Sequence, residues 1–260
     1  MSVAQPEQPA PSHEQLVGFY DEAYAGEGEQ ALLYSRWRAL GAIGKADHVI
    51  ELCARADVCP RRTLEVGCGD GALLGELAER GFGGVLHGVE IAQAAVDIAG
   101  ARREIDSVEL YDGRHLRCAE HAYDLGIVSH VLEHVPDPVS LLAEIARACG
   151  AVVVEVPLER NLSARRTAKR EHAAEVGHLQ RLSRSSTRAI VAQAGLRVAQ
   201  ELQDPLPLSV HLFFADSPLA RTRARVKWSV RELAHRSAPV LARRMFTVHY
   251  ACLCIPRAVR

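Results

Sequence analysis

Three glycines and two carboxylic acids in one short stretch are the first residues of this 260-residue chain that could hold a ligand. The stretch from Leu64 to Leu74 begins as an apolar strand and ends as a helix, with Gly67, Gly69 and Gly71 between them. These glycines let the backbone turn tightly and approach a bound molecule without Cβ atoms in the way. We therefore expect a seat for a nucleoside-type cofactor at the carboxyl end of a parallel sheet.

The acids of this stretch help to choose the cofactor. Gly67, Gly69 and Ala72 also satisfy the dinucleotide fingerprint G-x-G-x-x-G/A, so the turn alone does not exclude NAD. However, Glu65 and Asp70 would repel a pyrophosphate and attract a ligand that carries an ammonium and a sulfonium. The charge pattern therefore favours S-adenosyl-L-methionine over NAD.

A further acid lies where a ribose would be bound. The segment Leu86 to Glu90 is typical of a second strand, and Glu90 stands at its tip, roughly 20 residues after the glycine turn. Both cofactor classes use an acid here. Glu90 therefore supports a nucleoside without identifying it.

Two histidines could transfer a proton. His130 and His134 follow the expected fourth strand, Tyr123 to Ser129, and Glu133 lies between them. Because imidazole titrates near neutral pH, His134 is the first candidate for a general base and His130 the second. A hydroxyl acceptor needs such a base, whereas a neutral amine is already nucleophilic. In the alternative interpretation, Glu133 and His134 only shape the pocket.

Taken together, these motifs resemble the class I S-adenosylmethionine-dependent methyltransferases. The resemblance rests on Glu65-Val-Gly-Cys-Gly-Asp-Gly, on Glu90 and on the stretch from His130 to Pro138, and it runs from about Leu64 to Leu196. It is closest to the ubiquinone-type O-methyltransferases. It implies an α/β fold with a Rossmann-like doubly wound sheet of seven strands, the last one antiparallel, and methyl transfer to a small molecule, most simply to oxygen of a sugar or secondary metabolite.

The resemblance also implies roles for single residues. A helix carrying Tyr20 would close over the cofactor, Asp112 would lie beside the adenine, and His178 would face the acceptor as a third catalytic candidate. Each has a structural alternative: aromatic packing, an Asp-Gly turn and a loop contact. The expected cofactor-binding set is Glu65, Gly67, Cys68, Gly69, Gly71, Glu90, Ile91, Asp112, Gly113, Ser129 and Tyr20.

No metal site is expected. Some similar enzymes bind a divalent ion through acids beside the histidine of this motif, and Glu133 and His134 are present here. The acid expected three residues earlier is replaced by His130. The seven cysteines lack paired C-x-x-C spacing, so they are interpreted as reduced, buried residues.

Composition and length fit one domain. With 48% hydrophobic residues and a net charge of -1, the chain has the composition of a globular enzyme without a dominant nucleic-acid surface. It contains no apolar run long enough to span a membrane and no signal-peptide pattern, so a cytoplasmic location is expected. The expected partner is a small-molecule methyl acceptor; a homo-oligomer is left open.

The domain is expected to have four parts after a disordered leader at residues 1–13. Within residues 14–260 these are N-terminal lid helices (14–57), a cofactor-binding core (62–203), a helical substrate-side insertion (204–246) and the last strand (247–260). The insertion and the polar segment 161–184 are expected to wall the acceptor pocket. Segment 221–244 has eight Lys or Arg residues and one acid, which fits a solvated basic face, an anionic acceptor or a membrane surface.

Three alternative functions remain at this point. An N-methyltransferase would tolerate loss of the base. A non-catalytic accessory protein would bind the nucleoside and methylate nothing. An NAD-dependent oxidoreductase, the least favoured, would bind NAD rather than S-adenosylhomocysteine.

Overall fold

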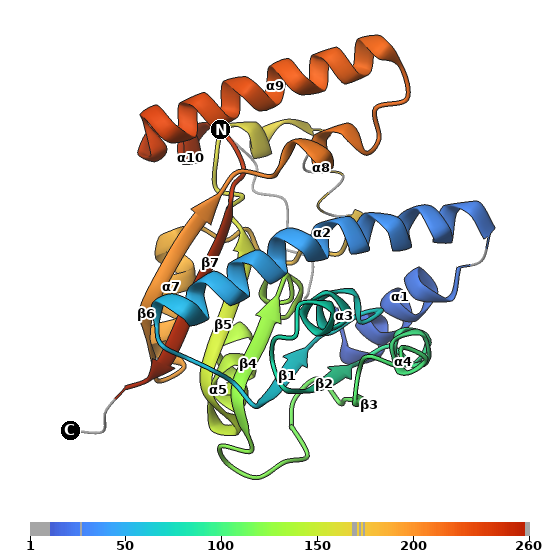
Figure 1. The fold of residues 1–260 in the computed structure, drawn as a ribbon, viewed down its shortest axis with the longest axis vertical. Helices are drawn as coiled ribbons and strands as arrows, with labels where there is room; N and C mark the ends of the chain where they lie inside the picture. Colours follow the sequence, from blue (N-terminus) through green and yellow to red (C-terminus); the bar gives the residue numbers. More distant parts are fainter. Residues whose placement is uncertain (1–10, 27, 168–170, 172, 174, 258–260) are drawn as a thin grey trace, which may run out of the picture.

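The computed structural model describes residues 11–26, 28–167, 171, 173 and 175–257, and its centre is a seven-stranded sheet (Figure 1). The order is β3-β2-β1-β4-β5-β7-β6; β7 runs antiparallel to both neighbours, and the other adjacent strands are parallel. This confirms the expected Rossmann-like sheet with an antiparallel last strand. The strands are β1 Arg62–Val66, β2 Val85–Glu90, β3 Ser107–Leu110, β4 Tyr123–Ser129, β5 Cys149–Pro157, β6 Leu196–Asp204 and β7 His249–Pro256.

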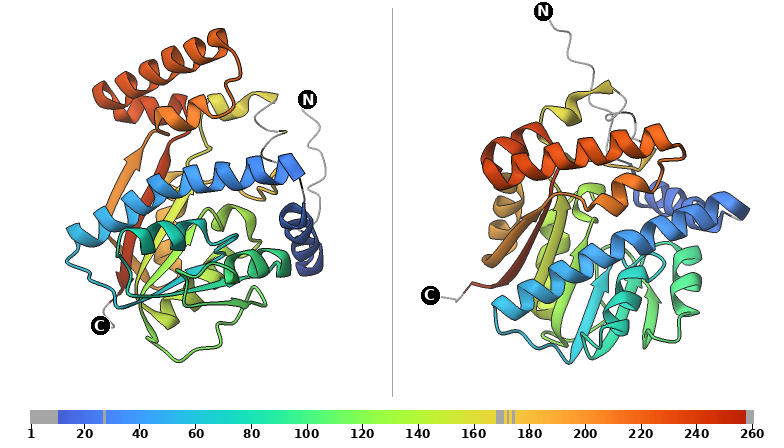
Figure 2. Two further views of the ribbon diagram at one scale, coloured as in Figure 1. Left: turned by 45° about the vertical axis from the view of Figure 1, so that its right-hand side comes forward. Right: turned by 45° about the horizontal axis from the view of Figure 1, so that its top comes forward.

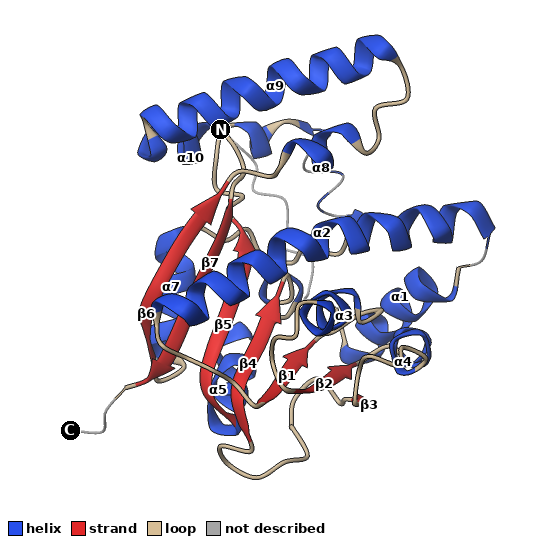
Figure 3. Cartoon of the chain, in the orientation of Figure 1, coloured by secondary structure: helices blue, strands red, loops and turns tan. Residues whose placement is uncertain are grey.

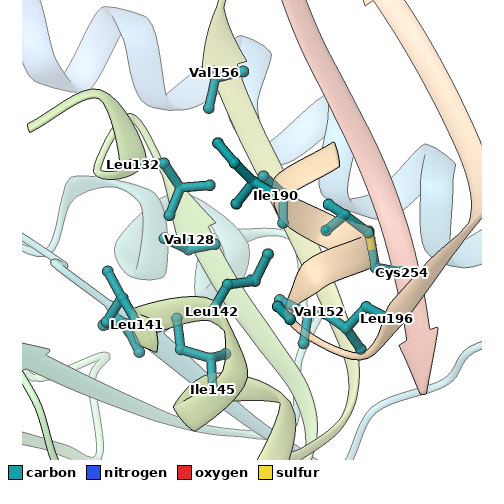
Figure 4. Close-up of a cluster of buried hydrophobic side chains, with 14 of the residues drawn as sticks. Val128, Leu132, Leu141, Leu142, Ile145, Val152, Val156, Ile190, Leu196 and Cys254 are labelled. Atoms are coloured by element: carbon teal, nitrogen blue, oxygen red, sulfur yellow. The ribbon is translucent and has the colours of Figure 1, made fainter. Parts of the chain in front are cut away.

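Helices cover both faces of the sheet (Figure 3). One face carries α2 (Gly28–Arg55), α3 (Ala72–Glu79) and α4 (Gln93–Gly100); the other carries α5 (Pro138–Ala148) and α7 (Arg184–Gln193). Because both faces are buried, β5 is apolar at consecutive positions: Val152 and Val154 enter the core under α5 and α7, and Val153 enters the core under α2 and α3. Figure 4 shows the first core, where Leu142 and Ile190 meet the sheet.

The local sequence explains where α7 begins, and packing explains why α2 continues past two glycines. Ser183 is the N-cap of α7: its hydroxyl accepts from the Ser186 amide, while the Ser186 hydroxyl accepts from the Ser183 amide. The sequence alone favours Ser185 or Ser186 as the N-cap. That prediction is wrong by two or three residues, because a run of serines does not show which of them pairs with which amide. The α2 helix is unbroken through Gly41 and Gly44, since its buried stripe packs on the sheet.

The N-terminal helix and the insertion before the last strand both lie at the carboxyl ends of the parallel strands. Residues 1–10 of the expected leader fall outside the described residues, and α1 (His13–Ala25) begins with Ser12 as its N-cap. The insertion, called the cap here, consists of α8 (Leu208–Leu212), α9 (Pro218–Ser237) and α10 (Pro239–Met245). It stands above the carboxyl ends of the parallel strands (Figures 1 and 2).

Aromatic contacts tie the cap to the core. The Trp37 ring of α2 packs against Phe213 and Phe214 of the insertion, at centroid distances of 5.2 and 4.9 Å, and these two rings also contact each other at 4.8 Å. Trp37 therefore connects α2 to the cap through aromatic packing. Among the described residues, no helix is both long and apolar enough to cross a membrane.

The core packing predicts a large stability difference between two leucines. Leu142 of α5 is 0% exposed and Leu233 of α9 is 66% exposed. Leu142→Ala should lower the free energy of unfolding by about 2–5 kcal/mol, because it leaves a cavity under the sheet. The matched change Leu233→Ala should alter it by less than about 0.5 kcal/mol. Urea unfolding followed by circular dichroism compares them, and equal effects would contradict this packing.

Candidate active site

A cavity of about 1680 Å³ opens along the carboxyl ends of the parallel strands. Its wall combines the glycine turn after β1, the end of β2, the loop after β4, helices α1 and α2, and the cap. A pocket for one ligand typically holds about 300–1,000 Å³. The cavity therefore has room for a cofactor and an acceptor side by side.

The glycine turn lies against neighbouring side chains with no room for a Cβ atom. Gly67 and Gly69 have φ values of 74° and 55°; a Cβ on Gly67 would lie 2.6 Å from Val131 Cγ2, and one on Gly69 would collide with the Tyr24 hydroxyl. Both glycines and Cys68 line the cavity. A ligand can therefore contact the backbone directly here.

Gly71 has a packing role instead. It is the left-handed N-cap of α3, and an added Cβ would lie 2.6 Å from Ile105 Cδ1. It does not lie on the cavity wall. The expected cofactor contact of Gly71 stays a prediction, and close packing against the segment before β3 is a separate reason for a glycine here.

The Glu90 carboxylate is fixed by the backbone around it. One oxygen accepts from the Gly69 amide at 2.9 Å, and the other accepts from the Ile91 amide at 2.6 Å. Burial raises the pKa of Glu90, and these amides counteract the rise. The Ala92 amide donates as well, at 3.4 Å, so of the about four hydrogen bonds that a carboxylate can accept about one remains for a ribose hydroxyl at the cavity wall.

Buried polar atoms without partners mark where a polar ligand fits. Within the described part of the chain, the Tyr20 and Tyr111 hydroxyls, Glu65 Oε2 and Ser129 Oγ have no hydrogen-bond partner, and all four residues line the cavity. Buried polar groups are nearly always satisfied in folded proteins. These atoms therefore suit a ligand with ammonium, carboxylate and ribose groups, such as S-adenosylmethionine.

Of the two acids in the turn, Glu65 is the one left for a cation. Asp70 forms an ion pair with Arg38 at 2.6 Å, so its charge is already balanced. Burial raises the pKa of Glu65 to about 8, with Lys45 lowering it and Glu90 and Asp70 raising it further. A bound ammonium would therefore favour the ionised form of Glu65.

Helix α1 places two tyrosines at the site. Tyr20 lies 5.8 Å from the His134 ring, and Tyr24, one helical turn later, reaches Gly69 beneath the Arg38 guanidinium. Burial raises the pKa of both hydroxyls. Tyr20 is an expected site residue, and Tyr24 is an additional one that the i, i+4 spacing could have indicated.

Asp112 is not brought to the cavity, whereas its neighbour Gly113 lies on the wall. The exposed Asp112 carboxylate accepts from the Arg114 and His115 amides at 2.8 and 2.7 Å, and these bonds lower its pKa. The expected adenine contact of Asp112 is thus not supported. Because the Asp112 side chain is short, it bonds to the backbone amides directly after it and does not extend to the cavity.

His134 and His178 meet at the acceptor side, with ring centroids 4.7 Å apart. His134 Nδ1 donates to the Gly177 carbonyl at 3.2 Å, and His178 Nδ1 lies 2.9 Å from Glu159 Oε2. Burial lowers the pKa of His134, although Glu133 opposes this. His134 is therefore neutral near pH 7, with Nε2 as its acceptor nitrogen.

His130 belongs to a different cluster. Its φ is +58°, its amide donates to the Glu155 carbonyl at 2.9 Å, and its ring lies 4.6 Å from the His249 ring. Burial alone would lower the pKa of His130, but Glu133 and Glu155 raise it. His130 thus packs beside His249 rather than His178, while Glu133 Oε1 lies 3.3 Å from His130 Nδ1 and 4.0 Å from His134 Nε2. Glu155 and His249 were missed by sequence reading.

The comparison with known families decides the cofactor. The profile of a family described as "Methyltransferase domain" matches residues 36–201, more than half of the chain. The chain belongs to this family of S-adenosylmethionine-dependent methyltransferases. Its cofactor is S-adenosyl-L-methionine, as the charge of the glycine turn indicated, and the NAD hypothesis is set aside.

Individual relatives match over different lengths. A ubiquinone biosynthesis O-methyltransferase of Neisseria meningitidis is 33% identical over 104 residues, which are 38% of this chain and 42% of the relative. The chain thus spans about two fifths of the length of the curated relatives it matches.

Solved structures match over nearly the whole chain. The geranyl diphosphate C-methyltransferase of Streptomyces coelicolor has a TM-score of 0.66 at 15% identity, covering 97% of this chain and 100% of that one. The cyclase SpnF has a TM-score of 0.61 at 17% identity, covering 96% and 99%. At such identities the likeness shows the fold alone.

The position of Glu90 predicts its effect on cofactor binding. Glu90→Ala should weaken binding of S-adenosylhomocysteine about tenfold to a hundredfold, because charged hydrogen bonds contribute about 1.5–3 kcal/mol each. The exposed Asp97 of α4 lies off the cavity, so Asp97→Ala should leave the affinity unchanged. Calorimetric titration measures both. Equal affinities of the wild type and Glu90→Ala for S-adenosylhomocysteine would show that Glu90 does not bind the cofactor.

The raised pKa of Glu65 predicts a pH dependence of binding. Below its pKa of about 8 the carboxyl is protonated, and it must release that proton to pair with the ligand's ammonium. Affinity for S-adenosylhomocysteine should therefore rise between pH 6 and about 8, by up to about tenfold per pH unit. Glu65→Gln should bind more weakly and without this slope. A flat wild-type profile in calorimetry would contradict the assignment.

Proposed function

We propose that the protein transfers the methyl group of S-adenosyl-L-methionine to an oxygen atom of a small-molecule acceptor. The cofactor supplies an electrophilic methyl carbon on a positively charged sulfur. The chain must then hold the acceptor in line with that carbon and take up the acceptor's proton. The observation that carries the proposal is the neutral, partly buried His134 on the wall of the cavity that the glycine turn also lines.

His134 has the features of a general base. Its Nδ1–H is held by the Gly177 carbonyl, so Nε2 is free to accept a proton from a hydroxyl. Glu133 Oε1 lies 4.0 Å from Nε2 and would stabilise the imidazolium once the proton has moved. His178 stands beside the ring, where Glu159 orients it toward the same space. A hydroxyl needs these groups more than an amine does, which favours O-methylation.

The cavity wall contributed by the cap favours an acceptor with an apolar body and an anionic group. Leu206, Val210 and Phe214 line it with apolar surface, and Lys227 and Arg231 of α9 add positive charge. The Arg231 guanidinium lies 5.1 Å above the Phe246 ring, and its buried Nε has no hydrogen-bond partner among the described residues. Such a wall fits an acidic secondary metabolite better than a neutral sugar.

The names of the curated relatives support oxygen as the attacked atom, since they are O-methyltransferases of ubiquinone biosynthesis. The direct test uses methyl-labelled cofactor with matched acceptors: an aromatic hydroxy acid, its amino analogue and a neutral sugar. We expect label on the hydroxy acid only. Faster transfer to the amino analogue would favour N-methylation. No transfer to any acceptor class would favour the accessory protein that binds the nucleoside without catalysis.

Substitution of His134 predicts a change in rate without a change in cofactor affinity. His134→Gln should lower kcat by about 10²–10⁴-fold, because the glutamine cannot take up a proton. Binding of S-adenosylhomocysteine should stay within about twofold of wild type, a size that corresponds to less than about 0.5 kcal/mol. The wild-type rate should be near its plateau at pH 7 and fall in acid, since the pKa of His134 is lowered.

A histidine outside the cavity provides the control for this experiment. His121 is exposed and has a left-handed φ of 51°, which asparagine adopts readily. His121→Asn should keep the wild-type kcat. If His134→Gln also keeps it, the base is another group or none is needed.

A further inference from the structure

Three side chains from neighbouring strands converge at the edge of the cavity. His130 follows β4, Glu155 lies in β5 and His249 begins β7, and these strands are adjacent in the sheet. Glu155 Oε1 accepts a hydrogen bond from His249 Nδ1 at 3.1 Å, which a bound ion would replace, and lies 3.6 Å from His130 Nε2. One potential ligand atom from each residue lies within 4.8 Å of the other two.

We propose that His130 Nε2, Glu155 Oε1 and His249 Nδ1 bind a divalent first-row transition-metal ion. Metal–nitrogen and metal–oxygen bonds of about 2.0–2.1 Å in a tetrahedral site place neighbouring ligand atoms about 3.3 Å apart. The separations of 3.1 and 3.6 Å lie on either side of that value. Two imidazoles and one carboxylate select zinc-, iron- or cobalt-type ions, whereas Mg²⁺ and Ca²⁺ prefer oxygen ligands.

The surrounding groups orient these ligands as in metal centres. The other ring nitrogen of His130, Nδ1, lies 3.3 Å from Glu133 Oε1. The second oxygen of Glu155 lies 3.3 Å from His48 Nδ1, and His48 Nε2 lies 3.3 Å from Asp204 Oδ2. Carboxylates that hold the outer nitrogen of a histidine fix its ring and its tautomer for a metal.

Unmet hydrogen bonds in the cluster point to a ligand rather than to pairing alone. Glu155 is 0% exposed and His48 is 7% exposed. Within the described ranges, Glu155 Oε2, His48 Nδ1 and His130 Nε2 make no hydrogen bond, although Glu155 Oε2 lies 3.3 Å from His48 Nδ1 and His130 Nε2 lies 3.6 Å from Glu155 Oε1. A cluster held together only by imidazolium–carboxylate bonds would satisfy these atoms. An ion bound by all three residues would coordinate His130 Nε2, and this bond does not require the geometry of a hydrogen bond.

A second group, Glu133, His134 and His178, also places three potential ligand atoms within 4.8 Å of one another. It corresponds to the place where similar enzymes hold a metal with acids. The approach of Glu133 Oε1 to His134 Nε2 is 4.0 Å, wider than a tetrahedral edge. The geometry therefore favours the cluster around Glu155. The proposal departs from the sequence-based expectation of no metal site, and the titration below decides between them.

The position of the centre gives the ion a role in catalysis. His130 and His249 line the cavity, so a fourth ligand would come from the cavity side. An acceptor oxygen bound there would have a lowered pKa, which helps a hydroxyl to become nucleophilic. This role rests on the proposed methyl transfer. Binding of the ion itself does not, so the two are tested separately.

The test is a Co²⁺ titration of the full-length protein after chelator treatment, without cofactor or acceptor. Visible absorption of bound Co²⁺ reports its coordination, and Zn²⁺ should displace it. We expect saturation at one equivalent. Glu155→Gln and His249→Ala should each weaken Co²⁺ binding at least tenfold, whereas His178→Ala should leave it unchanged. No saturable binding by wild type would overturn the proposal, as would wild-type binding by Glu155→Gln.

Two controls keep the outcome interpretable. Far-ultraviolet circular dichroism and S-adenosylhomocysteine affinity show that each variant is folded. His249→Ala serves as the second ligand variant because His249 is only half-buried, at the start of β7. Loss of binding in His178→Ala with binding retained in His249→Ala would assign the ion to the other group and refute the centre proposed here. Lack of methyl transfer would not affect any of these readings.

Discussion

The antiparallel pairing of β7 between β5 and β6 is the constraint on which the rest of the molecule depends. In this register Pro157 lies opposite His249, and Asp204 of β6 lies opposite the same residue. The chain must therefore leave the sheet at the end of β6 and re-enter it at the same edge. The three cap helices span this excursion, so they stand over the carboxyl ends of the parallel strands. The wall of the acceptor pocket is thus covalently joined to the sheet that seats the cofactor.

Buried acids at these strand ends set the electrostatics of the cavity. Glu65 lies one residue before the end of β1, Glu90 ends β2, Glu133 follows β4 and Glu155 lies near the end of β5, and all four are buried. Each is accommodated differently: backbone amides hold Glu90, imidazoles lower the pKa of Glu133 and Glu155, and the pKa of Glu65 is raised. The negative charge of these acids at the strand ends disfavours polyphosphates and favours cationic ligands, which is consistent with a sulfonium cofactor.

Sequence patterns predicted what is local and missed what is long-range. The glycine turn, the strand that ends at Glu90 and the antiparallel last strand follow from short motifs and from the family resemblance. Asp112 lies off the cavity wall for a local reason: its carboxylate accepts from the two amides that follow it. Glu155 and His249 lie about 94 residues apart, so nothing local joins them. The direction of the last strand could have placed His249 at the active edge, since an antiparallel strand begins where its parallel neighbours end.

The attachment of α1 has a consequence for the order of events in a catalytic cycle. The helix contains no fully buried residue, and Asp21 accepts from the Ala94 amide at 3.0 Å as one of its links to the core. A wall element held by so little buried surface separates at lower free-energy cost than the sheet or the cap. Tyr24, which it carries, covers the glycine turn. Exchange of spent for fresh cofactor would then be gated by the detachment of this helix, and turnover could be limited by product escape rather than by chemistry.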